Sequence, residues 1–172
     1  MRITGGVLRG RTVPGKPRPA TRPTASRVRE ALFSIVGQDL SGVTVLDAFG
    51  GTGLLSFEAA SRGAELAWVL EKDGAAVRQI RRSAEALGLA DRVIVRRGTA
   101  PKDLPPGRYG LILLDPPYAM DPTDVLTAAA PLAAGLVVLE HAASRPAPTV
   151  AGLTGSTRRY GDTALTLYEP EG

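Results

Sequence analysis

The tetrapeptide Asp115-Pro116-Pro117-Tyr118 directly follows a wholly apolar run, residues 111–114. The two prolines have no N–H group, so this loop offers hydrogen-bond acceptors without competing donors at those positions. The Asp115 carboxylate and the Pro116 carbonyl can together accept both N–H groups of an exocyclic amine on a nucleobase, and Tyr118 can stack on the base. A tight Pro-Pro turn is the alternative. The motif predicts chemistry at an exocyclic amine, with Asp115, Pro116 and Tyr118 as catalytic residues.

A second motif, Asp47-Ala-Phe-Gly-Gly-Thr-Gly53, joins a buried apolar segment to a predicted helix. Its three glycines lack the Cβ atoms that would keep a ligand away from the backbone. Glu71 ends the next apolar segment, where its carboxylate can accept both hydroxyls of a ribose. These residues favour an adenosine-containing cofactor, and a tight turn without a ligand is the alternative. A dinucleotide site would have a third glycine where Ser56 stands.

The composition excludes several classes of catalytic site. The chain has 172 residues, 44% hydrophobic and 22% charged, which fits one globular domain. It has no cysteine and a single histidine, His141, so we expect no thiol catalysis and no metal site. We interpret His141 as a strand-end residue with a local hydrogen bond. We expect a cytoplasmic protein without a membrane span, because the chain lacks both a long apolar run and an apolar signal segment.

Basic residues are concentrated at the start of the chain. Residues 1–38 contain eight basic residues against Glu30 alone, a net charge of +7, whereas residues 39–172 have a net charge of −3. This asymmetry predicts an arm that binds a polyanion, and a solvated surface loop is the alternative. We expect the arm to contribute little to the hydrophobic core. The predicted organisation is a basic extension over residues 1–38 and a main domain over residues 39–172, together forming one compact unit.

Local patterns predict the structure of this extension. Residues 1–8 and 11–13 flank a glycine-containing turn and are expected to pair as a small hairpin. Residues 13–24 contain four prolines and are expected to form an extended connector. Thr24 is expected to cap a helix that runs to about Val36.

From residue 42 onward, apolar strands alternate with helices. Strands are expected at 43–49, 66–70, 93–95, 111–114 and 135–139, helices at 54–62, 73–87 and 121–130, and a hairpin at 158–168. This order predicts an α/β fold with a doubly wound, mostly parallel, seven-stranded Rossmann-like sheet that ends in an antiparallel hairpin. Such sheets bind ligands at the carboxyl ends of their strands, which is where both motifs and Glu71 are expected to lie.

With these motifs, the chain resembles the bacterial 16S rRNA guanine-N2 methyltransferases, which use S-adenosylmethionine to modify the small ribosomal subunit. The resemblance covers nearly the whole chain. It is carried by residues 9–11, 21–24, 27–33, 47–53, 61–64, 71–73, 115–118 and 160–163. Asp-Pro-Pro-Tyr alone indicates an amine methyltransferase. Thr-Arg-Pro-Thr at 21–24, leading into Arg-Val-Arg-Glu-Ala-Leu-Phe at 27–33, narrows the resemblance from amine methyltransferases in general to this rRNA family.

The resemblance implies a methyltransferase fold, S-adenosylmethionine as the cofactor, and 16S rRNA of the small subunit as the partner. The residues implied to bind the cofactor are Asp47, Phe49, Gly50, Gly51, Gly53, Glu71, Lys72, Thr99, Ala100, Arg22 and Thr24. Those implied to bind RNA are Arg9, Arg11, Arg18, Arg22 and Arg27. Asp115, Pro116 and Tyr118 would handle the guanine. We expect the protein to act as a monomer.

The chain departs from the family pattern at two places. Family members usually have an asparagine where Ser83 stands, and an acidic residue where this chain has Gly98-Thr99-Ala100. We therefore expect backbone groups near Thr99 and Ala100, in place of a carboxylate, to contact the adenine.

Three other functions are alternatives to rRNA methylation. A DNA adenine-N6 methyltransferase would use the same tetrapeptide, but no segment is large enough for a DNA target-recognition domain. A non-catalytic RNA-binding module would be favoured by loss of Asp115 or of the glycines, and all of them are present. A nicotinamide dehydrogenase has no use for Asp-Pro-Pro-Tyr in hydride transfer.

Overall fold

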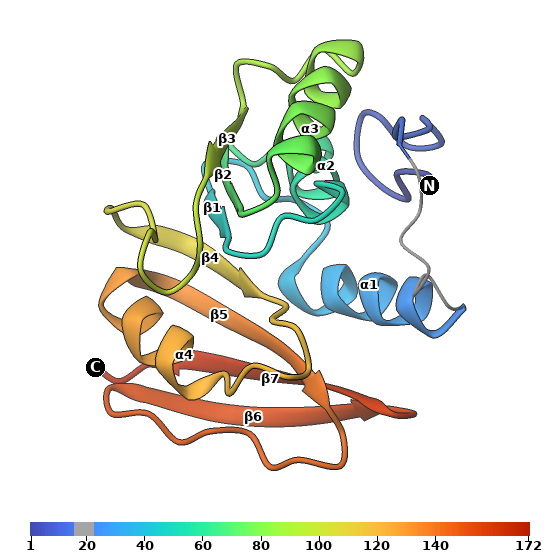
Figure 1. Cartoon of the computed structure of the whole chain (residues 1–172). Coiled ribbons are helices and arrows are strands. Elements are labelled where there is room, and N and C mark those ends of the chain that lie inside the picture. Colours follow the sequence, from blue (N-terminus) through green and yellow to red (C-terminus); the bar gives the residue numbers. More distant parts are fainter. Residues whose placement is uncertain (16–22) are drawn as a thin grey trace.

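The computed structural model describes residues 1–15 and 23–172 (Figure 1). The strands are β1 (Thr44–Asp47), β2 (Leu66–Glu71), β3 (Val93–Arg97), β4 (Tyr109–Leu114), β5 (Ala133–Ala142), β6 (Leu153–Tyr160) and β7 (Thr163–Pro170). The helices are α1 (Pro23–Val36), α2 (Leu54–Ser61), α3 (Gly74–Ala86), α4 (Thr123–Ala129) and a 3-10 turn, η1 (Ala130–Leu132).

These strands form one seven-stranded sheet in the order β3-β2-β1-β4-β5-β7-β6. Strands β1 to β5 are mutually parallel, and β7 runs antiparallel between β5 and β6. The predicted seven-stranded, mostly parallel sheet with a C-terminal hairpin is therefore confirmed. The strand order reverses between β1 and β4, which places the switch point of the sheet between the strands that end at Asp47 and Leu114.

Helices pack on both faces of the sheet, because side chains alternate between its two sides. On one face, α1, α2 and α3 contribute Phe33, Phe57 and Ile80 to a single buried cluster. On the other face, α4 contributes Val125 and Leu126. A sheet covered in this way binds ligands at the carboxyl ends of its strands, next to the switch point.

The start of α1 corrects one prediction. The helix begins at Pro23, so Thr24 lies inside its first turn and is not the cap. Proline suits the first helical position, because its fixed φ is helical and its missing N–H would have no partner there. In contrast, Asp73 caps α3 as expected, and its side chain accepts a hydrogen bond from the Ala75 amide at 3.1 Å.

The first thirteen residues, which are called the arm from here on, fold back on themselves without forming a regular strand. A single antiparallel bridge joins Arg2 to Thr12, and the Val13 amide donates to the Met1 carbonyl at 2.8 Å. The side chains of Ile3 and Val13 are each 1% exposed and belong to the same core cluster as α1, α2 and α3. The expectation that the arm contributes little to the core is therefore wrong, because two of its apolar residues complete the packing over α2 and α3.

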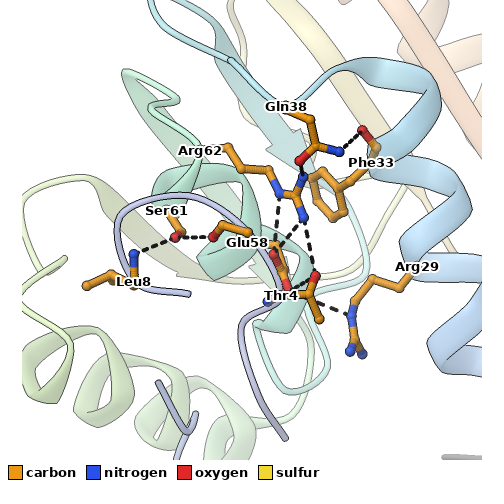
Figure 2. Close-up of polar contacts among 9 residues, drawn as sticks. Thr4, Leu8, Arg29, Phe33, Gln38, Glu58, Ser61 and Arg62 are labelled. Carbon is orange, nitrogen blue, oxygen red and sulfur yellow. Dashed lines mark hydrogen bonds and ion pairs between the residues drawn. The ribbon is translucent and has the colours of Figure 1, made fainter. Parts of the chain in front are cut away.

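The arm is held in place by a buried carboxylate in α2 (Figure 2). Glu58 is fully buried, and its Oε1 accepts hydrogen bonds from the Thr4 amide at 2.6 Å and from the Thr4 hydroxyl at 2.9 Å. Its Oε2 accepts from Nη2 of Arg62 at 3.3 Å. From α1, Nε of Arg29 lies 3.8 Å from Oε1. One charge thus connects the arm, α1 and α2.

Arg62 extends this connection to α1 (Figure 2). Its guanidinium carbon lies 4.5 Å from the centre of the Phe33 ring, and its Nη1 donates to the side-chain carbonyl of Gln38. Beside it, the Ser61 hydroxyl donates to the Gly5 carbonyl at 2.6 Å and accepts from the Leu8 amide at 2.9 Å. Residues of α1 and of the arm therefore meet at the C-terminal end of α2.

Replacing Arg62 by Met should lower the free energy of unfolding by about 3–5 kcal/mol, because the Glu58 carboxylate would stay buried without its main counter-ion. Urea denaturation measures this loss. The double variant R62M/E58Q removes the buried charge as well and should recover a large part of it. A double variant no more stable than R62M would contradict this assignment.

Candidate active site

Four carboxylates lie in a row at the carboxyl ends of neighbouring parallel strands. Glu71 ends β2 and Asp47 ends β1, whereas Asp115 and Glu140 follow Leu114 of β4 and Leu139 of β5, which are paired in register. Asp47 is close enough to Glu71 and Asp115 for each of them to raise its pKa, and Asp115 in turn raises the pKa of Glu140. The sheet therefore concentrates carboxyl groups across its switch point.

The glycine-containing loop is fixed by its own backbone. The Gly50 amide donates to the Leu70 carbonyl at 2.9 Å, and the Gly53 amide donates to the Gly50 carbonyl at 2.8 Å. A Cβ at position 50 would lie 2.3 Å from a methyl carbon of Val69, and Gly53 has a φ of 81°. Glycine is thus required at these two positions by close packing and by a left-handed backbone, independently of any ligand.

Glu71 is oriented by two backbone amides. The Gly51 amide donates to its Oε2 at 2.7 Å and the Asp73 amide donates to its Oε1 at 3.1 Å. The next residue, Lys72, has an exposed side chain, and its carbonyl accepts from Nε of Arg97 at 3.4 Å. Glu71 therefore has the position and acceptor chemistry that the two hydroxyls of a ribose require.

Asp47 lies beneath the loop and is only 1% exposed. Its carboxyl accepts from the Ser56 hydroxyl at 3.0 Å and from the Phe49 amide at 3.4 Å. Burial raises the pKa of Asp47 to about 7, and the two hydrogen bonds oppose that shift. Through these bonds Asp47 positions the loop, and its contact with the cofactor stays a prediction. Phe49, two residues further on, is half-buried.

The loop after β3 is closed by Asp103. Its carboxylate accepts from the Thr99 amide at 2.9 Å, and its own amide donates to the Thr99 carbonyl at 2.9 Å. Both backbone groups of Thr99 are therefore engaged within the turn, and the neighbouring Ala100 is buried. Ser83 is also buried, and its hydroxyl donates to the Pro14 carbonyl at 3.1 Å, which connects α3 to the chain just after the arm.

The Asp115–Tyr118 loop is placed as predicted, at the carboxyl end of the central strand β4. The side chain of Asp115 is exposed and Pro116 is buried, so the proline anchors the loop. Tyr118 is 63% exposed, and Nη1 of Arg145 donates to its carbonyl at 3.2 Å. An aromatic ring and a carboxylate are therefore both exposed on this one loop, where a base could contact either of them.

The basic residues predicted to bind RNA fall into two groups. Arg9, Arg11 and Arg27 have exposed side chains, Arg27 on α1 and the other two on the arm. Arg18 and Arg22 lie outside the described residues, and for Thr24 only its place in α1 is described. The structure therefore places three of the predicted RNA-binding residues on the surface.

His141 has the local hydrogen bonds that its interpretation requires. It lies in β5, where Nδ1 is 3.0 Å from the Ala142 carbonyl oxygen and Nε2 is 2.7 Å from the Thr166 hydroxyl. Across residues 1–15 and 23–172, no three or more acidic, histidine or cysteine side chains are arranged to hold a metal ion. Within the same residues, no helix has the length and apolar character needed to cross a membrane.

Comparison with known families identifies the family of this chain. The model of the family described as "Conserved hypothetical protein 95" matches residues 1–169. The chain belongs to this family. A relative from Bacillus subtilis (strain 168), named "Putative rRNA methyltransferase YlbH", is 29% identical over 184 residues and aligns over 100% of both chains. "Ribosomal RNA small subunit methyltransferase D" of Escherichia coli (strain K12) is 34% identical over 122 residues, which cover 69% of this chain and 60% of the relative.

Solved structures show the same fold. "Putative methyltransferase yhhF from Escherichia coli" superposes with a TM-score of 0.88 at 28% identity, over 99% of this chain and 98% of that one. A hypothetical protein of Thermus thermophilus, TTHA0928, has a TM-score of 0.80 at 32% identity, over 98% of this chain and 99% of that one. The seven-stranded sheet of this member of the family is therefore a methyltransferase fold.

Sequence reasoning missed two carboxylates in this family member. Glu140 lies next to Asp115 across the β4–β5 pairing, and burial raises its pKa to about 8, with a further contribution from Asp115. Its position directly after the predicted fifth strand was a usable signal. Asp103 is the acidic residue of the loop after β3, five residues beyond Gly98. Its role depends on a backbone turn that residue spacing alone does not reveal.

The raised pKa of Asp47 predicts a pH-dependent stability. Between about pH 4 and pH 7 the folded chain keeps a proton on Asp47 that the unfolded chain has lost. The contribution of Asp47 to the free energy of unfolding therefore falls as the pH rises through that window. The Asp47→Asn variant cannot ionise. Its unfolding free energy, minus that of the wild type, should therefore rise from pH 4 to pH 7 and level off above.

Urea denaturation at a series of pH values measures this difference. Asp121 is the control, because it is exposed and two hydrogen bonds from Thr123 lower its pKa. The Asp121→Asn difference should be flat above pH 5. A flat difference for Asp47→Asn as well would show that this carboxyl titrates normally.

Proposed function

We propose that this chain transfers a methyl group from S-adenosylmethionine to the exocyclic N2 of a guanine in 16S rRNA, within the small ribosomal subunit. The observation that carries the proposal is the meeting of Asp115-Pro116-Pro117-Tyr118 with Glu71 and the glycine loop at one edge of the sheet. The names of the two relatives support rRNA as the substrate class.

The described residues fit the cofactor. Glu71 would accept the two ribose hydroxyls, because two backbone amides already orient its carboxylate. The N-terminal end of α2, where Gly53 precedes the helix, would favour the negative carboxylate of the methionine part. The row of carboxyl groups would favour the positive sulfonium. Lys72, Phe49, Ala100 and Thr99 surround this edge on the adjoining loops and remain proposed contacts, as do Arg22 and Thr24.

The guanine would be held by hydrogen-bond acceptors of the Asp115 loop. Its N2 amine has two N–H groups, and the Asp115 carboxylate and the Pro116 carbonyl are acceptors on one stiff loop. Tyr118 would stack on the base with its exposed ring. The lone pair of N2 is delocalised into the purine ring, so these contacts would turn the nitrogen toward the methyl group. Most of the catalysis would thus come from positioning and exclusion of water.

The step balances without a metal ion. Bound S-adenosylmethionine would supply an electrophilic methyl group, and its sulfur would keep the electron pair of the bond that breaks as the bond to N2 forms. The methylated nitrogen would be strongly acidic and would lose one proton. The Asp115 carboxylate would accept that proton.

RNA would approach from the side of the basic arm. A groove of about 580 Å³ lies between the arm and α1, and arginines 2, 9 and 62 line it together with Glu30. Lys/Arg contacts to phosphates supply most of the sequence-independent affinity for nucleic acid. Arg9, Arg11 and Arg27 are exposed and suited to such contacts, and we propose the same role for Arg18 and Arg22.

Incubation with labelled S-adenosylmethionine tests the function directly. Three substrates are compared: unmethylated 16S rRNA transcript, small subunits reconstituted with it, and duplex DNA. Mass spectrometry of the digested nucleosides should show N2-methylguanine from an RNA substrate. Methylation of adenine in the duplex DNA, or of no substrate, would contradict the proposal.

Replacing Asp115 by Ala should lower the turnover number by about 10²-fold or more, because the group that holds the amine is lost. Calorimetry should find the affinity for S-adenosylmethionine nearly unchanged. Asp124→Ala, an exposed carboxylate in the first turn of α4, is the control and should retain activity. Lost cofactor binding with near-normal turnover would show that the role of Asp115 is misassigned.

Replacing Tyr118 by Ala should weaken transition-state stabilisation by about 1–3 kcal/mol, the energy of one base stacked on an aromatic ring. Phe keeps the ring and should restore most of kcat/KM measured with the RNA substrate. If Phe is as poor as Ala, the hydroxyl group and not stacking is what matters.

A further inference from the structure

A groove of about 590 Å³ lies on the α4 face of the C-terminal hairpin, outside the site described above. Its walls are the loop over residues 143–149 and the facing side chains of β5, β6 and β7. In Figure 1 this loop leaves the end of β5 and runs beneath β6. Among the residues that the structure describes, none of those predicted to bind the cofactor or to act in catalysis lines the groove.

The floor of the groove is a fixed line of polar groups. Nε2 of His141 lies 2.7 Å from the Thr166 hydroxyl, which lies 2.8 Å from the Thr157 hydroxyl. His141 and Thr166 are buried. The Tyr168 hydroxyl donates to the Pro148 carbonyl at 2.7 Å and holds the loop against the sheet. These groups come from three strands and one loop, so the fold itself shapes the groove.

The charges that line the groove are all positive. Arg145 and Arg159 are exposed, and no aspartate or glutamate is among the described residues that line it. Four acidic residues lie nearby in sequence. Glu140 and Glu169 alternate to the opposite face from His141 and Tyr168, and Asp162 lies in the hairpin turn. Glu171 follows β7 and accepts a hydrogen bond from the Thr154 hydroxyl at 3.2 Å. An anionic ligand therefore meets two guanidinium groups and no lining carboxylate.

The groove is joined to the proposed catalytic loop. Nη1 of Arg145 donates to the carbonyl of Tyr118 at 3.2 Å, so one residue both lines the groove and fixes the loop. On the other side, the Ala143 amide donates to the Asp162 carbonyl at 2.8 Å, which ties the loop to the hairpin turn. An RNA strand whose base is bound at Tyr118 would therefore run past Arg145.

We propose that this groove binds the backbone of the RNA strand beside the target guanine, with Arg159 in contact with a phosphate. The inference rests on the proposed function and extends it to the strand next to the modified base. A base whose N2 reaches Asp115 is displayed by a single strand, so its flanking phosphates lie near the Tyr118 loop. Arginine suits this task, because its planar fork matches a phosphate.

The chain offers a matched control, because Arg158 and Arg159 are consecutive residues of β6 and point to opposite faces. The variants R159Q and R158Q remove the same charge, and only residue 159 lines the groove. Equilibrium binding of the unmethylated 16S rRNA transcript is measured over a series of salt concentrations, and KM for RNA, KM for S-adenosylmethionine and kcat are measured with the same transcript.

R159Q should weaken RNA binding roughly tenfold, the effect of losing one charge-assisted hydrogen bond. It should also reduce the slope of log affinity against log salt by about 0.7–0.9, the value for one phosphate contact. KM for S-adenosylmethionine and kcat should not change. R158Q should leave all these values close to those of the wild type.

Equal effects of the two variants, or an unchanged salt slope in R159Q, would overturn the proposal, because the groove would then make no specific phosphate contact. This failure is distinct from that of the proposed function. If the wild type methylates guanine N2 in RNA and R159Q behaves like the wild type, only the groove is misassigned. If the wild type binds and methylates no RNA, both proposals fail.

Discussion

The architecture depends on one buried charge, the carboxylate of Glu58 in the middle of α2. A buried carboxylate is tolerated only when it is paired and hydrogen-bonded, so the partners that surround it cannot be omitted. Thr4 and Arg62 supply those bonds, and Arg29 places a second guanidinium group beside them. The arm, α1 and α2 are therefore mutually dependent, although Thr4 and Glu58 are 54 residues apart in sequence.

The same helix transmits this constraint to the edge of the sheet. Helix α2 begins directly after Gly53, and its Ser56 hydroxyl holds Asp47 beneath the glycine loop at 3.0 Å. In the loop, the Gly51 amide then donates a hydrogen bond to the Glu71 carboxylate at 2.7 Å. Each step joins a carboxyl group to a backbone amide or a hydroxyl, which leaves little freedom for the loop. An edge built in this way is organised before any ligand arrives.

The strands and helices could be predicted from the sequence because apolar periodicity and turn residues are local signals. The Asp115 loop and Glu71 followed from that order, since parallel strands end at one edge. One prediction that failed, the cap at Thr24, had a local competitor in Pro23. The other, that the arm contributes little to the core, failed because of contacts between distant segments. Helix α2 is buried on nearly every side, so its composition does not show that Ile3 and Val13 cover it. The burial of Asp47 was equally hidden, because Ser56 approaches it only in the folded chain.

The distribution of charge explains how a polyanion could be presented to a row of carboxyl groups. Burial and mutual repulsion raise the pKa of Asp47 to about 7 and that of Glu140 to about 8, so the row carries less than its full negative charge near neutral pH. Phosphates would still be repelled from this edge and attracted to the arginines beyond it, on the arm and in the groove lined by Arg159. Held at both sides, an RNA strand could place only a neutral base in the middle. A base edge rich in N–H donors is then favoured, because the Asp115 loop has a carboxylate and no N–H donor at Pro116 and Pro117.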